Sequence, residues 1–407
     1  MATAVRRQRN VGGMLVLLLG AAVFLNYVDR GAVGIAAPLL KSDLHLSPET
    51  YGIAFSAFFW VYAPIQLFAG WLCDRFSVYR LMSLGILVWA GSTLLTGFVG
   101  GFASLLVLRV MLGIGESISF PGSSKIIARH VPPESRGMAN AFVAAGIALG
   151  PAVGTLAGGM IMAGFGWRVM FVTFGVLTLL WLLPWRSLVA SLDTAAHEKT
   201  GRRVPVGALI GKWPLWSMSI AHAAGNYCFY FLLAWLPLYL VQSRGYSIAQ
   251  MTLLATAGYS VQAVAAFSFG HLSDKWTRSG RSEGTMRRWM MVLSQAASAA
   301  AILALAFAQS TAMTAILLCI AGVATASLSL NLYAVAQMFS GREAAGTWVG
   351  VQNALGNLSG IVGPIVTGFI VAAAGYQMAF VVTAAVALFG AFWWLLAIPA
   401  IREVELD

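Results

Sequence analysis

Long apolar runs, separated by short polar stretches, recur along the whole chain. A run of about 20 residues is enough for a helix to cross a hydrocarbon layer of about 30 Å, and this criterion predicts about twelve membrane-spanning helices. The first run is about twice as long as the apolar core of a signal peptide, so we expect it to be a span. The approximate limits are residues 13–38, 51–71, 81–100, 103–125, 139–162, 169–185, 215–240, 250–270, 289–308, 312–337, 346–372 and 378–398.

The composition agrees with a membrane protein. Of the 407 residues, 59% are hydrophobic and only 10% are charged. A soluble chain of this length could not bury so much apolar surface, because a folded core covers only part of it. The predicted fold class is therefore an all-α membrane protein, embedded in a lipid bilayer.

Lysine and arginine are unevenly distributed between the two predicted sides of the membrane. With the N-terminus inside, the predicted outer loops hold only Lys41, Arg168 and Arg244 of the 25 basic residues. Basic residues accumulate in cytoplasmic loops, so the bias predicts that both termini are cytoplasmic. It also accounts for the formal net charge of +11, and no nucleic-acid partner is expected.

Cysteine and histidine give no sign of a metal site. Cys73, Cys228 and Cys319 lie in or beside predicted spans, and the five histidines are scattered. Neither set has the spacing of metal ligands, so we expect buried thiols, no metal and no cofactor.

A polar stretch and an internal repeat divide the chain into halves. Residues 187–212 form the longest hydrophilic stretch. Three pairs of segments recur in the same order: "GWLCDR" and "GHLSDK", "GIALGP" and "GIVGP", "GWRVMF" and "GYQMAF". Parallel repeats are typical of transporters whose substrate site lies near the midplane between the halves. We therefore predict an N-terminal bundle of about six helices (1–186), a cytoplasmic linker (187–212) and a similar C-terminal bundle (213–407).

The first of these pairs resembles the loop signature of the major facilitator superfamily. "GWLCDR" holds Asp74 and Arg75, its copy holds Asp274, and Ser77 stands where the superfamily motif usually has glycine. Together with the glycines of "LGPAVGTLAGG", the resemblance covers essentially the whole chain. An acid beside a base at a helix end could latch neighbouring helices on the cytoplasmic side. A solvated loop that only follows the charge bias is the alternative.

Four ionisable residues remain inside apolar runs, all of them in the first half: Asp29, Arg30, Arg109 and Glu116. Insertion into a membrane costs about 2.5–3.5 kcal/mol for each, which makes them functional-site candidates. Asp29 and Arg30 could instead cap a helix at the outer surface, but the apolar "GAVGIAAPLL" that follows argues against it. We expect these two neighbours to form a switchable ion pair.

Arg109 and Glu116 lie on the fourth predicted span. Their spacing of seven residues places both on one helix face, about 10 Å apart along the axis. Gly113 and Gly115 between them are expected to leave room beside that face. The arginine and the carboxylate could bracket a small anion. A structural ion-pair network that links the first and fourth helices is the alternative.

These residues carry a second resemblance. "NYVDR", a tyrosine on the second span and the arginine–glutamate pair are similar to the anion:cation symporter branch of the superfamily. That branch includes D-galactonate/hexuronate and sialin-like carriers. The resemblance implies proton-coupling acids, a substrate ligand with an internal counter-ion, and hydrogen-bond donors to the substrate; these are respectively Asp29 and Glu116, Arg30 and Arg109, and Tyr27 and Tyr62.

The chemistry is coherent without the resemblance. A guanidinium group suits a carboxylate, which it can bind through two parallel hydrogen bonds. An anion that occupies the arginine removes its attraction from a nearby acid, which then takes up a proton more readily. Anion binding and proton binding are therefore linked.

Neutral polar residues are expected to complete the site from the second half. Tyr230 and Asn353 are the preferred candidates, although a single asparagine or histidine can equally serve an interhelical hydrogen bond. Some relatives contribute an amide from the fifth helix, and "AAGIALGP" has none, which admits a smaller or less hydroxylated acid. Gly146, Gly150 and Gly154 are expected to pack helices. Further candidates are His222, Asn226, Tyr259, Gln262, Asn331, Tyr333, Gln352 and Asn357.

Three functions compete at this point. A secondary active transporter in the inner membrane, functional as a monomer, would take up a sugar acid or other small carboxylate by proton symport through alternating access. An anion exchanger needs the arginines but not the acids. A receptor or an enzyme is disfavoured, because no soluble domain and no nucleophile with an adjacent base are found in the sequence.

Overall fold

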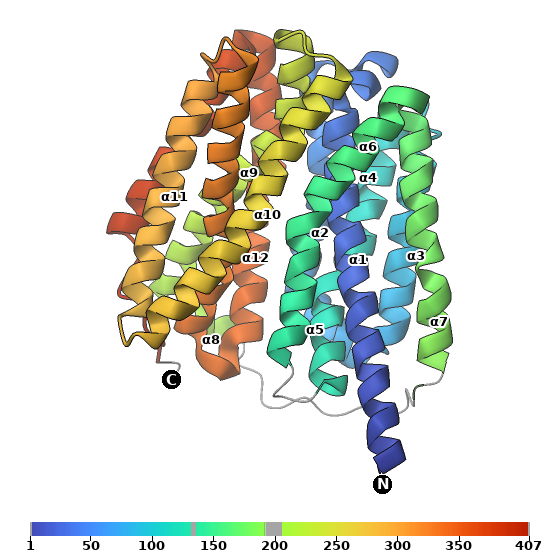
Figure 1. Cartoon of the computed structure of the whole chain (residues 1–407), viewed down its shortest axis with the longest axis vertical. Coiled ribbons are helices and arrows are strands. Elements are labelled where there is room, and N and C mark those ends of the chain that lie inside the picture. Colours follow the sequence, from blue (N-terminus) through green and yellow to red (C-terminus); the bar gives the residue numbers. More distant parts are fainter. Residues whose placement is uncertain (1, 132–135, 191, 193–205, 406–407) are drawn as a thin grey trace. The chain divides into compact units, whose positions relative to one another are not determined.

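The structure is a computed structural model that describes residues 2–131, 136–190, 192 and 206–405 (Figure 1). The chain divides into two compact units, which we describe separately. Unit 1 holds Met1–Leu44 and Ala57–Thr200, and unit 2 holds His45–Ser56 and Gly201–Asp407. Residues 193–205 of the predicted linker lie outside the described residues, so the predicted domain limits stay a prediction.

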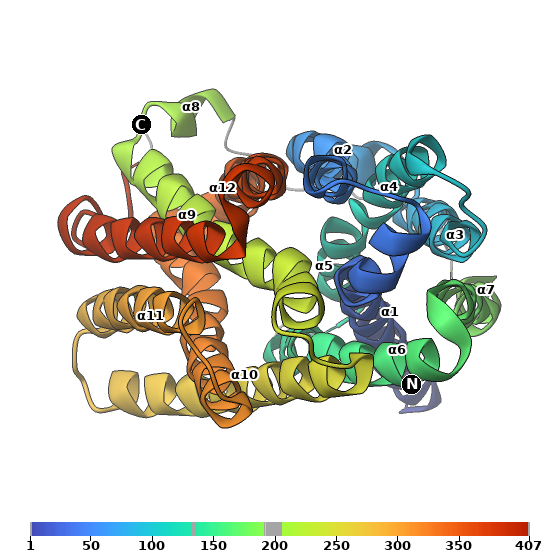
Figure 2. The same ribbon diagram turned by 90° about the horizontal axis from the view of Figure 1, so that it is seen from above.

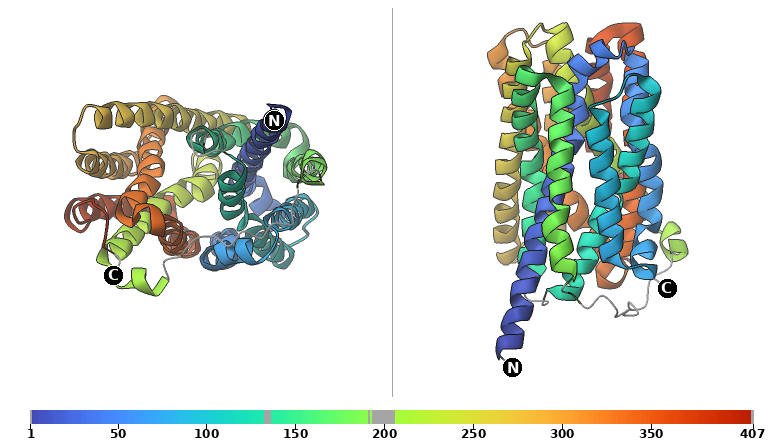
Figure 3. Two further views of the ribbon diagram at one scale, coloured as in Figure 1. Left: turned by 90° about the horizontal axis from the view of Figure 1, so that it is seen from below. Right: turned by 90° about the vertical axis from the view of Figure 1, so that its right-hand side faces the viewer.

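Helices make up the regular structure of unit 1. Their bounds are α1 (Ala2–Asp43), α2 (Pro48–Arg75), α3 (Val78–Thr96), α4 (Phe102–Glu116), α5 (Ser119–His130), α6 (Arg136–Leu180) and α7 (Leu182–Ala190), with the first turns of α2 belonging to unit 2. At its N-terminal end α1 extends beyond the other helices of this unit (Figure 3). No strand occurs in either unit among the residues that the structure describes.

The helices α1 and α6 lie side by side over a long contact (Figure 2). Glycines make this possible. A Cβ atom added to Gly146 would lie 2.9 Å from the Gly20 carbonyl oxygen, and one on Gly150 would lie 2.6 Å from the Tyr27 Cβ. Small residues let helix backbones approach closely inside a membrane. The predicted packing role of the glycine stripe is confirmed.

Unit 2 is helical in the same way. Its elements are α8 (Val206–Ile210), α9 (Trp213–Leu238), a π-helical turn η2 (Tyr239–Ser243), α10 (Ile248–Arg278), α11 (Glu283–Leu305) and α12 (Thr311–Leu396). Its core holds the fully buried indoles of Trp235, Trp348 and Trp394. Large apolar side chains such as Leu253 and Leu396 are exposed, as expected for surfaces that face lipid.

Within the described ranges, 10 helical segments are long and apolar enough to cross a membrane. Two of them, 142–190 with 49 residues and 344–396 with 53, are about twice as long as the 17–25 residues or so that one crossing needs. Each is broken at a glycine in the left-handed region, Gly166 with φ 84° and Gly375 with φ 77°. The ribbon of α6 turns back on itself within unit 1 (Figure 1).

The helix limits differ from the predicted spans at three glycines and one break. Glycine adopts positive φ readily, so successive helical segments join without a loop at Gly166, Gly341 and Gly375. The predicted span 103–125 is interrupted at Ser117 and Ile118, between α4 and α5. Gly166 and Gly375 begin the repeated segments "GWRVMF" and "GYQMAF", so this sequence repeat is also a repeat of local conformation.

Candidate functional site

An ion pair joins α1 to α4 inside unit 1. The Arg30 Nε donates to Glu116 Oε2 at 3.0 Å and to the Asn26 side-chain oxygen at 3.1 Å. The Glu116 side chain is fully buried, and the Arg30 side chain is 12% exposed. Removing one partner of a buried ion pair costs about 3–5 kcal/mol, because the other charge is left uncompensated. The two groups therefore depend on each other, or on a replacement.

Glu116 occupies the last position of α4, directly before the break in the helix. The backbone polar groups at such a break need partners. The Ser117 hydroxyl donates to the Ile114 carbonyl at 2.7 Å, and the Gln66 amide donates to the Ser117 carbonyl at 3.5 Å. The break thus brings a carboxylate to a point where the backbone is held by side chains.

Asp29 turns to a different helix from its neighbour. Its Oδ2 accepts hydrogen bonds from the Trp89 indole N–H at 2.5 Å and from the Thr93 hydroxyl at 3.2 Å, both on α3. Successive residues point about 100° apart around a helix, so Asp29 and Arg30 face different neighbours. The expected pairing of Asp29 with Arg30 is wrong in its partner: the ion pair of Arg30 is with Glu116.

Each of the two buried acids has one carboxylate oxygen that accepts no hydrogen bond among the described residues. Among the described residues, Asp29 Oδ1 and Glu116 Oε1 have no hydrogen-bond partner. A buried polar atom without a partner is costly, and a carboxyl group that is protonated there gains a donor. These two oxygens are the positions at which the charged cluster of Asp29, Arg30, Arg109 and Glu116 could hold a proton.

Aromatic rings surround the arginines. The guanidinium carbon of Arg30 lies 4.7 Å from the centre of the Tyr62 ring, 5.2 Å from that of Tyr27 and 5.3 Å from that of Phe58. The guanidinium carbon of Arg109, which is buried, also lies 5.3 Å from the Phe58 ring centre. The structure therefore brings the predicted residues of the first half together.

Sequence reasoning missed Phe58 and Trp89. Phe58 stands one turn before Tyr62, within the apolar run "AFFWVY". The sequence gives no feature that distinguishes it from neighbouring residues that face lipid. Trp89 lies in a similar run. The only sequence feature that could have identified these two residues is their helical spacing from a polar residue, and many core residues share that feature.

The expected room beside Gly113 and Gly115 is absent. A Cβ atom on Gly113 would lie 2.2 Å from the Phe58 carbonyl oxygen, and one on Gly115 would lie 2.5 Å from the Trp89 backbone nitrogen. The backbones of α2 and α3 occupy that space, as small residues permit in membrane proteins. This expectation is wrong, and the glycines instead place Phe58 and Trp89 against the cluster.

In unit 2 the predicted polar residues form a neutral chain of hydrogen bonds. The Tyr230 hydroxyl donates to the Asn357 side-chain oxygen at 2.5 Å, and the Asn357 amide donates to the Asn353 side-chain oxygen at 3.0 Å. The Tyr333 hydroxyl donates to the same Asn353 oxygen at 3.0 Å. Tyr230 and Asn353 are thus linked through Asn357, across α9 and α12.

The remaining polar candidates of unit 2 contact other residues of the same unit. His222 is buried, and a Cβ atom on Gly356 would lie 2.4 Å from its ring. The Asn226 amide donates to the Gly356 carbonyl at 3.4 Å. Gln352 accepts from the Trp348 indole at 3.1 Å. Tyr259 and Gln262 line a mostly apolar pocket between α9, α10 and α12.

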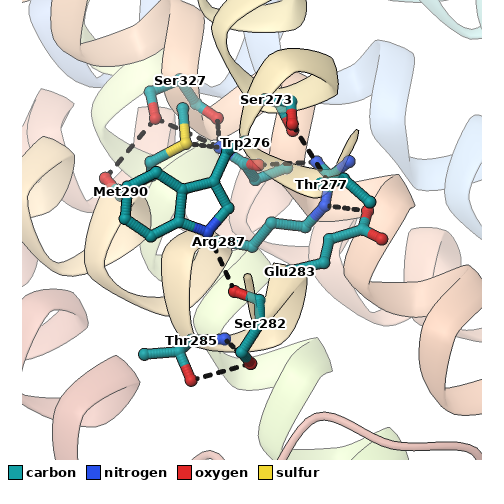
Figure 4. A network of polar contacts seen from close by, with 10 residues as sticks. Ser273, Trp276, Thr277, Ser282, Glu283, Thr285, Arg287, Met290 and Ser327 are labelled. Atoms are coloured by element: carbon teal, nitrogen blue, oxygen red, sulfur yellow. Dashed lines mark hydrogen bonds and ion pairs between the residues drawn. The ribbon is translucent and has the colours of Figure 1, made fainter. Parts of the chain in front are cut away.

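Asn331 is bound to a cation rather than open to a ligand. The Arg287 guanidinium donates to the Asn331 side-chain oxygen at 2.9 Å and to Glu283 Oε1 at 2.7 Å. Figure 4 shows Arg287 turned towards Glu283 near the start of α11. The Arg287 side chain is only 11% exposed, so it reaches into the unit from the helix end.

The predicted cytoplasmic latch stays a prediction. Asp74 and Asp274 lie in the last turns of α2 and α10, and their side chains lie outside the described part of the structure. Arg75, the last residue of α2, is exposed. Cys73 and Cys228 are buried, as expected, but Cys319 on α12 is only partly buried, so the expectation is wrong for that thiol. No cluster of His, Cys, Asp or Glu that could hold a metal ion occurs among the described residues.

Comparisons with known proteins agree on one family. The sequence profile of the Major Facilitator Superfamily matches residues 19–282 and 247–406. The chain is 30% identical to the probable galactarate/D-glucarate transporter GudP of Escherichia coli K12, over 100% of this chain and 97% of that protein. It is 28% identical to the hexuronate transporter of Bacillus subtilis 168, over 92% of each.

A solved structure shows the same fold. A bacterial homologue of the human lysosomal transporter Spinster, in an inward-facing and occupied conformation, superimposes with a TM-score of 0.81. The superposition covers 95% of this chain and 96% of the other, at 21% sequence identity.

Proposed function

The chain belongs to the Major Facilitator Superfamily, as do the membrane transporters compared above, and we propose that it takes up a small organic anion together with protons. One observation carries the proposal: the buried ion pair between Arg30 and Glu116, with an open oxygen on the acid. A carboxylate that binds Arg30 competes with Glu116. The displaced acid is then a buried charge without compensation, and a proton on its open oxygen relieves that cost.

The charges of the cluster support the coupling. With both acids ionised, Asp29 and Glu116 balance Arg30 and Arg109. Each proton taken up leaves one positive charge in excess, and an anion restores neutrality in a medium of low dielectric. Proton and anion therefore favour each other's binding. Asp29, held by neutral donors of α3, is the second proton-coupling acid of the proposal.

The proposed substrate is a sugar acid or another small carboxylate. The relatives include a probable galactarate/D-glucarate transporter and a hexuronate transporter. Two guanidinium groups suit a carboxylate, and the hydroxyl groups of Tyr27 and Tyr62 lie on rings that contact Arg30. Within "AAGIALGP" the fifth crossing presents glycine backbone towards α1 and has no amide side chain, which also admits a smaller or less hydroxylated acid.

Alternating access requires a particular topology. We count each of the kinked ranges 142–190 and 344–396 as a pair of crossings, which makes about twelve crossings in two bundles. An even number leaves both termini on one side, and the basic loops place that side in the cytoplasm. The bacterial relatives favour the inner membrane. We propose a monomer as the functional form.

Impermeant thiol reagents test this topology in intact cells. A cysteine introduced at Ser42, beside the end of α1, should react from outside. A cysteine introduced at Ser282, before α11, should react only after the membrane is opened. Labelling of the second position from outside would reverse the orientation.

Anion exchange is the second candidate. Its support is that Arg30 already neutralises Glu116, so an exchanged anion could replace the acid without any proton. Proteoliposomes separate the two functions. Labelled D-glucarate and D-glucuronate are offered to empty vesicles with and without an inward proton gradient, and to vesicles preloaded with unlabelled acid.

Symport predicts accumulation in empty vesicles only when the gradient is present. An exchanger would require internal anion and would ignore the gradient. Arg30→Gln should abolish uptake, because the anion loses its cation. Arg186→Gln is a matched control, since Arg186 is exposed on α7. Gradient-independent uptake that occurs only in preloaded vesicles would refute symport.

A further inference from the structure

Two cations share one aromatic ring in unit 1. The guanidinium carbons of Arg30 and Arg109 each lie 5.3 Å from the centre of the Phe58 ring. They are therefore separated by no more than twice that distance. Like charges repel each other strongly where water is excluded. Asp29 and Glu116 offset that repulsion while both are ionised, but a further contact is needed once one of the acids takes up a proton.

The ring is held in place from several sides. Phe58 is 2% exposed. Its carbonyl oxygen lies where Gly113 has no side chain, so α2 and α4 touch backbone to backbone at this residue. One turn further along α2, the Tyr62 ring stacks on it with centres 4.8 Å apart and planes 26° apart. The ring is thus a fixed surface rather than a mobile filler.

We infer that Phe58 is a positioning residue that holds both embedded guanidinium groups in the orientation in which they bind an anion. The inference rests on the proposed function. The face of an aromatic ring carries negative potential and attracts cations, most strongly where they are desolvated. A ring contacts the flat side of a guanidinium group and leaves the N–H edges for Glu116 or for a carboxylate. Phe58 thereby keeps the two arginines together without taking their donors.

The competing explanation is that Phe58 only fills space. Phe58→Leu tests this, because leucine remains apolar and close in volume but has no π face. A double-mutant cycle combines Phe58→Leu with Arg109→Gln and compares thermal unfolding midpoints of the purified proteins. Residues in contact give non-additive effects, whereas independent residues give additive ones.

We expect the double variant to lose clearly less than the sum of the single losses. The control cycle uses Phe174→Leu, a buried phenylalanine of the same unit that packs on Gly158. That cycle should be additive with Arg109→Gln. An additive Phe58 cycle would overturn the inference, and this readout needs no substrate. If Phe58→Leu does not fold, Phe58→Met replaces it in the cycle, as a flexible side chain that also lacks a π face.

Binding of D-glucarate and D-glucuronate gives the second readout. Phe58→Leu should weaken binding by about thirtyfold, as expected for the loss of a desolvated cation–π contact, and leave the maximal exchange rate near that of wild type. Phe58→Tyr, which keeps the ring face, should restore affinity. Wild-type affinity in Phe58→Leu would contradict the inference alone. Failure of the wild-type protein to bind either acid would contradict the proposed sugar-acid substrate, and the double-mutant cycle would still decide whether Phe58 couples to Arg109.

Discussion

The two units bury different kinds of polar residue in their interiors. Unit 1 holds the Arg30–Glu116 ion pair and the carboxyl group of Asp29. Unit 2 holds a neutral chain from Tyr230 through Asn357 to Asn353. A neutral hydrogen-bonded chain keeps its charge whatever the pH. The ion pair and the acid can change theirs, which is why we assign the proposed proton coupling to unit 1.

The scaffold, by contrast, repeats. After Gly166, the Trp167 indole donates to Asp43 at 2.9 Å, beside the end of α1. After Gly375, the Tyr376 hydroxyl donates to Gln242 at 2.9 Å, in the turn that follows α9. In each unit an aromatic residue directly after a kink thus ties the helical segment that follows the kink to the end of α1 or to the turn after α9. The repeat conserves how helices are joined and leaves the buried chemistry of each half free to differ.

Neutralising Glu116 should have the largest effect. Glu116→Gln mimics the protonated acid, keeps its shape and releases Arg30 to the anion. We expect gradient-driven accumulation in proteoliposomes to fall to background, while binding and exchange of labelled acid persist. Asp29→Asn tests the second acid in the same assay. If both variants accumulate substrate as the wild type does, neither acid carries the coupling proton and exchange replaces symport.

Shortening Arg109 should have the next largest effect. Arg109→Lys keeps the charge but loses the planar fork of donors. We expect affinity for the acid to fall by about tenfold or more, which matches the 1.5–3 kcal/mol or so of a charged hydrogen bond. Arg287→Lys is the matched control in unit 2, where the arginine contacts Glu283 and Asn331 and should not affect binding. Wild-type affinity in purified Arg109→Lys would exclude this role.

The contrast between the units was partly predictable from the sequence. Apolar runs must match the thickness of a membrane, so most spans were found by length alone. Charges inside such runs are so costly that Asp29, Arg30, Arg109 and Glu116 were found as a set. Hydropathy alone therefore identified which half carries charged residues inside its apolar runs.

The pairing of those groups was not predictable. It depends on how each helix is rotated about its own axis, which the sequence does not give. In the structure Arg30 faces Glu116, whereas the neighbouring Asp29 faces Trp89. The role of Gly113 was misread for the same reason, because a missing side chain looks the same whether a ligand or a backbone fills the space. Phe58 was missed because its apolar neighbours in the sequence resemble it.

Removing one hydrogen bond from the neutral chain should have a smaller effect. Tyr230→Phe loses the donor to Asn357 and keeps the ring. Interhelical hydrogen bonds in membrane proteins contribute about 0.6 kcal/mol on average, so we expect a modest fall in the unfolding midpoint. The pH dependence of uptake should stay that of wild type. A pH profile that shifts as it does in Glu116→Gln would place proton coupling in unit 2 as well.

The repeated ties behind the two kinks should matter least. Trp167→Phe and Tyr376→Phe each remove one donor and keep an aromatic ring. The Asp43 side chain is 52% exposed, so water can replace the lost donor and the cost should stay below about 1 kcal/mol. We expect small and similar falls in the unfolding midpoint when both variants are measured in the same detergent. Uptake in proteoliposomes and its pH dependence should be unchanged. A large loss of gradient-driven uptake in only one of the two variants would show that this tie serves transport in that unit alone. The scaffold would then differ between the units as their buried chemistry does.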